Sequence, residues 1–301
     1  MRIGFVKPTF AGERRVALLP EHVQRPYAIE RGFGLTLGIP DSEYEARGCD
    51  IMPRESVYRE CGVIVNLKLT QPSDYPFLRD EHVLVGWTHP SGSGHVFFQK
   101  VARPRGITVL DLDNVTPTAY RGERSARLPI PRDFIRENSW LAGYASVTHA
   151  LLVHGTLAEA GTPCAVLGAG NVSQGALAAL TRHGARPRVF TRRNMSDFDP
   201  AAFKVIANGI ESDGGHIITL DQQAQCRDVL FIDAAADADG TIEGMRNTSI
   251  NSPTFGRYGN TYYGVNNSPS LLYRVASRVI SRAFSEYAYG LPFDRIREDL
   301  T

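Results

Sequence analysis

Short apolar runs separated by turn-forming residues recur from Met1 to about Asn138. Four runs have the length of buried strands and lie at residues 3–6, 63–69, 82–87 and 107–112. Turn-forming clusters such as Gly38-Ile39-Pro40-Asp41 stand between them. This pattern predicts strands that alternate with helices, which is typical of an α/β fold.

Two longer segments have helical patterns. Residues 139–160 are rich in Ala, Leu and Val, with the capping residue type Ser139 at the start and the stop signal Gly161-Thr162-Pro163 at the end. From Pro269 onward, apolar residues recur at spacings of three and four, which predicts an amphipathic helix. These residues are Leu271, Leu272, Val275, Val279, Ile280 and Phe284. We expect this C-terminal helix to return to the first region of the chain.

Between these helices lies a short repeated pattern of strand and helix. An apolar run at 164–167 is followed by a glycine-rich loop, a helical pattern over 172–183 and a second run at Val189-Phe190. The order of strand, loop, helix and strand indicates one βαβ unit. Further short runs are expected to extend a parallel sheet and lie at 216–220, 229–232 and 262–265.

Length and composition narrow the class of protein. A chain of 301 residues with 43% apolar and 22% charged residues is typical of a folded protein with two domains. The net charge of +1 leaves no excess of either sign, so neither nucleic acid nor a membrane is expected as a partner. The chain opens without a signal-peptide pattern and its four cysteines form no CxxC pair, so we expect a cytoplasmic protein without a metal site.

The segment Gly168-Ala169-Gly170-Asn171-Val172-Ser173 joins the predicted strand to the predicted helix. In a dinucleotide-binding loop the first glycine allows a tight turn, and the second lets the backbone approach a pyrophosphate at the helix N-terminus. Ser173 replaces the third glycine, so we expect the helix to lie slightly farther from the strand, with Gly175 restoring some closeness. The order of elements favours a dinucleotide site over an ordinary βα turn, with Gly168, Gly170, Asn171, Val172 and Ser173 as binding residues.

The second strand of this βαβ unit ends at Thr191-Arg192-Arg193, where an NAD-binding protein usually has an acid for the ribose 2′-hydroxyl. A hydroxyl and two guanidinium groups would instead bind a 2′-phosphate through charge-assisted hydrogen bonds. Arginine is the common cation of this chain, which has only four lysines, so two adjacent arginines also occur without a function. The sequence favours NADP(H) as the cofactor.

Several motifs resemble those of the alanine dehydrogenase and saccharopine dehydrogenase superfamily. The opening of that superfamily is matched by RIGFVK at 2–7 and ERRVALLP at 13–20. Its lysine-containing strand end is matched by NLKLTQP at 66–72, and its catalytic histidine turn by GWTHP at 86–90. Later blocks are matched by SWLAG at 139–143, IDAAAD at 232–237 and VNNSP at 265–269, so the resemblance covers nearly the whole chain.

Within this superfamily, the short length and three blocks are most similar to the carboxyethylornithine synthase family. The blocks are GERRVALLP at 12–20, WTHPSGSG at 87–94 and GNVSQG at 170–175. The resemblance implies an NADP-dependent oxidoreductase acting on CH–NH groups, an opine dehydrogenase. Such an enzyme condenses an α-keto acid, here expected to be pyruvate, with the side-chain amine of ornithine, lysine or a related amino acid. It then reduces the product with NADPH, in agreement with the arginines at 192 and 193.

The resemblance also implies three candidate catalytic residues. Arg15 and Lys68 correspond to groups that bind the keto acid, whose carboxylate and polarised carbonyl suit cations. The scarcity of lysine draws attention to Lys68. His89 corresponds to the general acid/base, a task for which an imidazole that titrates near neutral pH is suited.

Three further residues match functional positions of the superfamily. Asp237 corresponds to a catalytic acid near the nicotinamide, although Asp237-Ala238-Asp239-Gly240 is equally a good turn sequence. Ser139 and Asn267 correspond to residues that hold the cofactor, and each could equally cap a helix.

We therefore expect an α/β protein of two domains, a Rossmann-like parallel-sheet domain and a discontinuous α/β substrate domain. Residues 1–137 and a C-terminal helix at 275–301 would form the substrate domain, and residues 138–274 the NADP-binding domain. The partners would be a small-molecule keto acid and amino acid, and we expect a homo-oligomer, a dimer. Two alternatives stay open: alanine dehydrogenase-like reductive amination with ammonia, and a non-catalytic NADPH-binding sensor.

Overall fold

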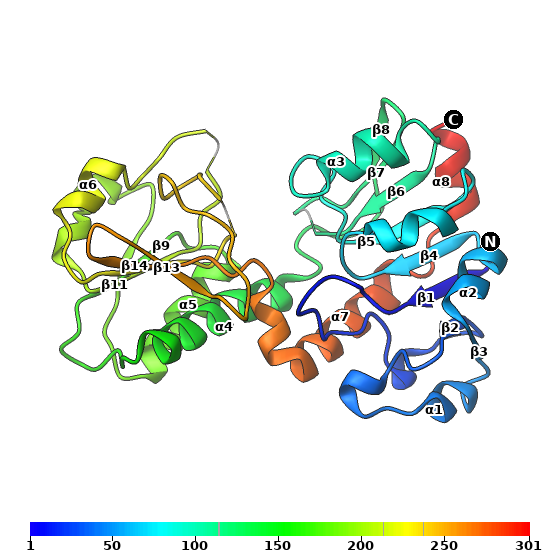
Figure 1. Ribbon diagram of the computed structural model, residues 1–301, viewed down its shortest axis with the longest axis horizontal. Helices are drawn as coiled ribbons and strands as arrows, with labels where there is room; N and C mark the ends of the chain where they lie inside the picture. The colour runs from blue at the N-terminus through cyan, green and yellow to red at the C-terminus, as the bar shows by residue number, and fades with distance from the viewer. Residues whose placement is uncertain (114, 213, 237) are drawn as a thin grey trace. The chain divides into compact units, whose positions relative to one another are not determined.

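The computed structural model describes residues 1–113, 115–212, 214–236 and 238–301. Within it the chain divides into two compact units (Figure 1). Unit 1 consists of residues 1–135 and 273–301, so the chain leaves this unit and later returns to it. Unit 2 is the continuous segment between them, residues 136–272. Each unit has its own sheet of mainly parallel strands.

Unit 1 contains an eight-stranded sheet with the order β3-β2-β1-β4-β5-β6-β7-β8. Its strands are β1 (Ile3–Val6), β2 (Ala28–Glu30), β3 (Asp50–Met52), β4 (Val63–Asn66), β5 (Val83–Gly86), β6 (Thr108–Asp111), β7 (Thr118–Arg121) and β8 (Arg124–Arg127). The first six are parallel, and β7 and β8 form an antiparallel hairpin at one edge. The strand order reverses at β1, and such a reversal in an open α/β sheet is the usual place for a ligand.

Helices cover both faces of this sheet. They are α1 (Asp41–Glu45), α2 (Arg54–Glu60), α3 (His95–Phe97), α7 (Tyr273–Tyr287) and α8 (Phe293–Asp299). On one face, Val57 of α2 packs in a buried cluster with Val6 and Ile64. Because side chains alternate along a strand, Phe5 points to the opposite face. There it contacts Tyr289, which follows α7, with ring centroids 4.9 Å apart.

Unit 2 contains a six-stranded sheet with the order β10-β9-β11-β12-β14-β13. Its strands are β9 (Cys164–Leu167), β10 (Arg188–Phe190), β11 (Val205–Asn208), β12 (Leu230–Asp233), β13 (Thr254–Arg257) and β14 (Asn260–Tyr263). Only β13 runs antiparallel to its neighbour in this sheet. The order reverses at β9, the strand that leads into the glycine loop.

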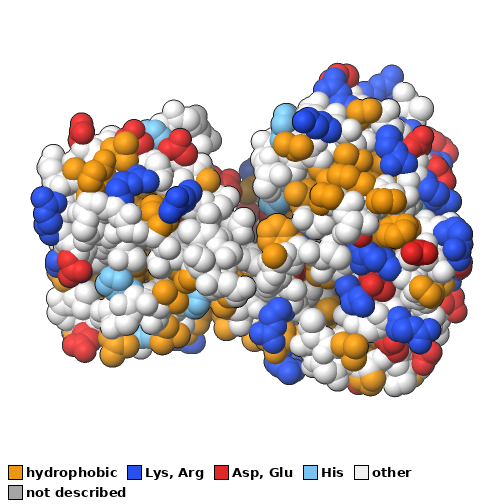
Figure 2. All heavy atoms as spheres, viewed as in Figure 1, with side chains coloured by type: hydrophobic (Ala, Val, Ile, Leu, Met, Phe, Trp, Pro, Cys, Tyr) orange, Lys and Arg blue, Asp and Glu red, His pale blue; other side chains and the backbone are white. Residues whose placement is uncertain are grey.

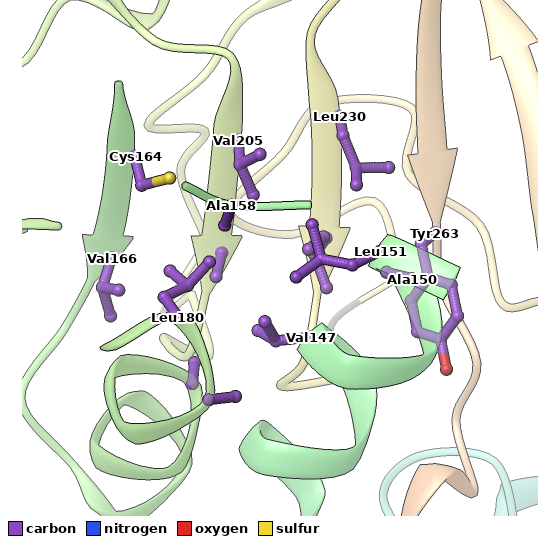
Figure 3. Packing of buried hydrophobic residues seen from close by; sticks show 14 of the residues in the cluster. Val147, Ala150, Leu151, Ala158, Cys164, Val166, Leu180, Val205, Leu230 and Tyr263 are labelled. Carbon is purple, nitrogen blue, oxygen red and sulfur yellow. The ribbon is translucent and has the colours of Figure 1, made fainter. Parts of the chain in front are cut away.

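One buried cluster of unit 2 lies between its sheet and two long helices, and a second is rich in aromatic side chains such as Phe190 and Phe231. Figure 3 shows Val147, Ala150 and Leu151 of α4 (Arg136–His154) facing side chains from β9, β11, β12 and β14. α5 (Asn171–Arg182) packs against α4 at two glycines, where no side chain would fit. A Cβ atom on Gly143 would lie 1.8 Å from the Val172 carbonyl oxygen, and one on Gly175 would lie 1.9 Å from the Trp140 carbonyl oxygen. A third, shorter helix is α6 (Leu220–Gln225).

The structure differs from the sequence prediction at both ends of α4. The helix begins at Arg136, so Ser139 lies inside it rather than capping it. It ends at His154 because Gly155 adopts a left-handed conformation with φ of 72°, which closes a helix before the predicted stop at Gly161.

The segment predicted as a strand at 216–220 does not join the sheet. It contributes one isolated bridge, from Ile218 to Ile242, and then enters α6. Thr219 and Gln222 form a reciprocal capping box at the start of that helix, and this local signal outweighs the apolar run. The sheet also contains β11, next to β9, for which the sequence pattern predicted no strand.

The predicted fold class is confirmed, with a doubly wound sheet in each unit. Figure 2 shows basic and acidic side chains interspersed over the visible face of unit 1, on the right, in keeping with the net charge of +1. No helix in the described part of the chain combines the length and apolar character that a bilayer crossing requires.

Candidate active site

The carboxyl ends of the central strands of unit 1 carry the candidate catalytic residues. Lys68 lies two residues after β4, and His89 lies three residues after β5. Arg15 lies in the loop that follows β1, the strand at which the order reverses. Neighbouring parallel strands end at the same edge of a sheet, so the fold brings these three residues together from positions far apart in the sequence.

His89 is held by an acidic partner that the sequence analysis did not identify. Its Nε2 lies 2.9 Å from an Oδ2 of Asp113, and both side chains are just under one-third exposed. Burial favours the neutral imidazole, but the hydrogen bond and charge of Asp113 outweigh it, so the pKa of His89 is raised. Burial alone would raise the pKa of Asp113, yet its contact with His89 lowers it. The pair therefore favours an imidazolium beside a carboxylate.

A second aspartate shapes the turn that carries His89. Asp111, the last residue of β6, accepts backbone N–H bonds from Thr88 at 3.2 Å and from His89 at 3.3 Å. His89 itself has a φ of 44°, a left-handed conformation that is uncommon for a residue with a side chain. Gly94 packs against the same turn. A Cβ atom there would lie 1.8 Å from the Thr88 carbonyl oxygen, so only glycine fits at this position. This backbone fixes the direction of the imidazole.

Arg15 is enclosed and paired. Its Nε donates to Glu13 Oε1 at 2.7 Å and its Nη2 to Glu13 Oε2 at 2.6 Å, while its guanidinium lies 4.6 Å from the centroid of Trp87. The side chain is only 1% exposed. Burial raises the pKa of Glu13, but the charge and hydrogen bonds of Arg15 reverse this effect and hold the pKa below its ordinary value. Glu13 is thus a permanent counter-charge for Arg15.

Lys68 is the more accessible cation of the group. The residue is partly exposed, whereas Arg15 is buried, and the Lys68 Nζ lies 5.6 Å from the ring centroids of both Phe10 and Trp87. Burial lowers the pKa of Lys68, and the positive charge of Arg15 lowers it further. Asp113 acts in the opposite direction. Lys68 therefore loses its proton more readily than an ordinary lysine.

Two buried asparagines end strands in corresponding places of the two units. Asn66 ends β4 and is 4% exposed, and neither its Nδ2 nor its Oδ1 has a hydrogen-bond partner among the described residues. Asn208 ends β11, and its Nδ2 donates to the Ile210 carbonyl at 3.0 Å and to Asp233 at 3.1 Å. Its Oδ1 accepts from the Ile210 N–H at 3.0 Å. The side-chain amide of Asn66 is therefore available to a ligand, whereas the amide of Asn208 is already hydrogen-bonded within the protein.

The glycine loop of unit 2 has the geometry of a dinucleotide-binding turn. Gly168 adopts a φ of 95°, which favours glycine. Gly170 precedes α5 directly, and a Cβ atom placed there would meet nothing within 4 Å, so the backbone is open to a ligand. α5 has no acidic residue in its first turn, where Asn171 and Val172 offer backbone N–H groups. These features fit the pyrophosphate of a dinucleotide.

Ser173 holds α5 against the sheet in place of the missing glycine. It is 1% exposed, and its hydroxyl donates to the Leu167 carbonyl of β9 at 2.9 Å. The space for it comes from Gly209 after β11, where a Cβ atom would lie 2.3 Å from Ser173 Oγ. The expected role of Gly175 is therefore wrong, since Gly175 faces α4 rather than the strand.

The turn after β10 presents two arginines. Asn194, which the sequence analysis overlooked, organises this turn: its Oδ1 accepts from the Thr191 N–H at 2.8 Å and its Nδ2 donates to the Val189 carbonyl at 3.0 Å. The Thr191 hydroxyl also donates to Asn194, at 3.2 Å. Arg192 and Arg193 are exposed, and within the described ranges no acidic side chain pairs with either.

Two other candidates for cofactor binding lie in unit 2. Ser139 is partly exposed within α4. Asn267 precedes a 3₁₀-helix at Ser268–Leu272 and is 3% exposed. Its Nδ2 has no hydrogen-bond partner in the part of the chain that the structure describes. This buried donor is therefore available to a ligand. Asp237 lies outside the described residues.

The three acids that the sequence analysis missed share one property. Asp113, Asp111 and Glu13 gain their significance from contacts with His89 or Arg15, not from a motif of their own. Asp113 and His89 are 24 positions apart and meet because β5 and β6 are neighbours. The run of Asp111 and Asp113 after an apolar strand was the available signal, because acids at strand ends commonly belong to ligand sites.

Comparison with known proteins defines the class. The alanine dehydrogenase/PNT N-terminal domain matches residues 4–128, and the alanine dehydrogenase/PNT C-terminal domain matches residues 225–298. A solved L-alanine dehydrogenase is similar in fold, with a TM-score of 0.78 and 20% identity over 100% of this chain and 93% of the other. A transhydrogenase from Sinorhizobium meliloti has a TM-score of 0.73 and 19% identity over 95% and 92%. The chain belongs to the alanine dehydrogenase/PNT family of nicotinamide-dependent oxidoreductases.

Closer relatives narrow the assignment. An N(5)-(carboxyethyl)ornithine synthase from Clostridium botulinum is 43% identical, with 96% of this chain and 94% of the relative covered. A protein of the same name from Lactococcus lactis is 41% identical, with 99% and 98% covered. The chain therefore belongs to the family of the N(5)-(carboxyethyl)ornithine synthases, and the resemblance found in the sequence is confirmed.

Proposed function

We propose that this protein catalyses an NADPH-dependent reductive condensation of pyruvate with the side-chain amine of ornithine or lysine. The observation that carries the proposal is the group formed by His89, Asp113 and Lys68 at the carboxyl ends of neighbouring strands. It combines an imidazole of raised pKa with an amine of lowered pKa. The names of the relatives supply the class of reaction, and their identity of 41–43% supports transferring it.

The keto acid would be bound by Lys68 with the help of Arg15. Lys68 is a partly exposed residue with a compact charge, suited to the carbonyl oxygen, on which negative charge develops as the amine attacks. Arg15 keeps the region positive, and a substrate carboxylate would share its guanidinium with Glu13. Trp87, beside both cations, would form an apolar wall that excludes water.

His89 would supply the proton for dehydration. The uncharged amine attacks the carbonyl carbon, which forms a carbon–nitrogen bond and leaves a hydroxyl on the same carbon. Transfer of a proton from the ring nitrogen of His89 that is not bonded to Asp113 lets that hydroxyl depart as water and leaves a protonated imine. Asp113 favours the protonated imidazole before this step and holds its orientation. A positioned acid of this kind contributes about 10²- to 10⁴-fold to rate.

Unit 2 would bind the dinucleotide. Gly168, Gly170, Asn171, Val172 and Ser173 would form the loop and first helical turn around the pyrophosphate. Arg192 and Arg193 would contact the 2′-phosphate from the turn that Thr191 shares with Asn194. Ser139, Asn267 and Asp237 stay proposed contacts. When bound, the dinucleotide supplies the hydride that reduces the imine to a secondary amine.

The deciding experiment measures oxidation of NADPH by the purified protein with a grid of keto acids and amines. We expect turnover to require both pyruvate and a diamino acid. The product mass should equal the sum of the masses of the two substrates less the mass of one oxygen atom.

Turnover with pyruvate and ammonia alone would instead establish alanine dehydrogenase-like amination. NADPH binding without turnover for any pair would contradict the proposal and favour a sensor. A parallel series with NADH tests the preference between the cofactors.

A further inference from the structure

The segment that follows Arg15 is held by side chains rather than by a regular element. Residues 16–19 belong to no helix or strand, yet their backbone lies in the buried part of unit 1. The Val16 N–H donates to Ser277 Oγ at 3.0 Å, and the Leu19 N–H donates to Ser281 Oγ at 2.7 Å. Both serines belong to α7, more than 250 residues away in the sequence.

The carbonyl groups of the same segment are bound in a similar way. The Tyr289 hydroxyl donates to the Ala17 carbonyl at 2.7 Å. The Tyr44 hydroxyl donates to the Leu18 carbonyl at 2.9 Å. Each of the four residues after Arg15 thus has one backbone group fixed by a buried side chain, and three of these four bonds come from the C-terminal segment.

The serines of α7 occur at a spacing of four residues on the buried face of the helix. Ser277 and Ser281 are 0% exposed and Ser285 is 4% exposed. A buried hydroxyl is costly unless it is hydrogen-bonded, so a helix that only packed against the sheet would favour alanine here. Ser277 and Ser281 have partners in the loop, whereas the Ser285 hydroxyl has none among the residues described. Ser285 therefore serves as a matched control for Ser277: it is a buried serine of the same helix that does not bond the loop.

Arg15 lies between two fixed points. The Glu13 carboxylate accepts the backbone N–H of Arg15 at 2.9 Å, and Ser277 accepts the next N–H along the chain. Contacts with Glu13 and Trp87 then orient the guanidinium group of Arg15. Arg15 has little freedom as long as the segment after it is held.

We propose that Ser277 is a positioning residue for Arg15, and that Ser281 and Tyr289 hold the rest of the same segment. The inference rests on the proposed function, in which Arg15 takes part in binding the keto acid. α7 starts at Tyr273, where the chain returns to unit 1. The returning helix would thus complete the keto-acid site without contributing a group that touches the substrate.

The test compares Ser277→Ala with Ser285→Ala in the full-length protein, using pyruvate, ornithine and NADPH. Ser277→Ala should raise the KM for pyruvate by about 10-fold, since a displacement near 1 Å of a binding group has effects of this order or larger. Its kcat and its KM for NADPH should stay within about twofold of the wild type. Ser285→Ala should leave all three constants unchanged. The same result for both serine variants would overturn the proposal.

A pH profile provides a second readout. The charge of Arg15 contributes to the lowered pKa of Lys68. Displacement of Arg15 in Ser277→Ala should therefore raise the Lys68 pKa and shift any limb of the profile due to Lys68 to higher pH. Loss of stability alone would lower the unfolding temperature without moving that limb, and would count against a positioning role.

Two further variants separate the possible failures. Tyr289→Phe removes only the bond to the Ala17 carbonyl and should also raise the KM for pyruvate, so it carries the test if Ser277→Ala does not fold. An unchanged KM in folded Tyr289→Phe would then overturn the proposal. Arg15→Met tests the underlying function: if it leaves the KM for pyruvate unchanged, the role of Arg15 itself is wrong. A raised KM in Arg15→Met with none in Ser277→Ala would reject the positioning role alone.

Discussion

The candidate residues of unit 1 and unit 2 use different chemistry. In unit 1 they are charged side chains that act on one another: His89 binds Asp113, Arg15 binds Glu13, and Arg15 and Asp113 both shift the pKa of Lys68. In unit 2 they are mainly backbone N–H groups at a helix start, together with the exposed Arg192 and Arg193. Substitutions within a network are not additive, whereas separate contacts are. This contrast can be measured.

The largest effect is expected for unit 1. His89→Gln removes the proton donor and should lower kcat by about 10²- to 10⁴-fold. Lys68→Met removes the cation and should cost about 10²- to 10³-fold. Because both residues serve one reaction step, the double variant should lose much less than the product of the two effects. Steady-state kinetics measure the losses, and NADPH titration by fluorescence provides the control, with unchanged affinity. A fully multiplicative loss would contradict the network.

The arginines of unit 2 should give a smaller and additive effect. Arg192→Ser and Arg193→Ser should each raise the Kd for NADPH by about 10-fold, and the double variant by about 100-fold, because a hydrogen bond to a charged group contributes about 1.5 to 3 kcal/mol. The Kd for NADH should change less than about twofold, since NADH lacks the 2′-phosphate. Equal weakening of both dinucleotides would show that these arginines do not select the cofactor.

Asp113→Asn should change the pH dependence of the reaction. Burial by itself lowers the pKa of His89, and Asp113 is what raises it, so the variant should have a lower His89 pKa. A proton donor must be protonated, hence the alkaline limb of kcat/KM should move to lower pH. The loss of kcat/KM relative to the wild type should therefore be larger at alkaline pH than at acidic pH, where both imidazoles are protonated. A profile that keeps its alkaline limb would exclude His89 as the group responsible.

The smallest effect is expected for the two strand-end asparagines, and it concerns stability. Asn208→Leu should lower the free energy of unfolding by about 1 to 3 kcal/mol, because the partly buried Ile210 N–H loses its acceptor. Asn66→Leu should raise it by about 1 kcal/mol, because a buried amide without partners is removed. Urea denaturation measures both. A loss of stability in Asn66→Leu equal to that in Asn208→Leu would mean that Asn66 is bonded in the folded protein.

The sequence was most informative where a local pattern decides the structure. The apolar runs of β1, β4, β5 and β6 became strands, and the loop at Gly168 and Gly170 has the expected turn geometry. These features depend on side-chain alternation and on glycine conformation, which are properties of neighbouring residues.

Contacts over long sequence distances were not predictable in the same way. Asp113 pairs with His89 because of strand order, and Ser277 and Ser281 of α7 bond a loop that is distant in the sequence. The pattern of apolar residues placed Val275 on the packed face, but it is 48% exposed, while Ser277 and Ser281 are buried. Because the sequence analysis looked only for apolar residues, it did not recognise the serine-containing face of α7 as the buried one.

The interrupted path of unit 1 has a consequence for its biogenesis. Every residue of unit 2 is synthesised before α7, so the core around β9 and α4 can assemble while unit 1 still lacks the helix that binds the loop after Arg15. The bond from Tyr289 to Ala17 joins residues 272 positions apart, and contacts of such separation slow folding. The half of the enzyme that leaves the ribosome first is therefore the half that finishes last.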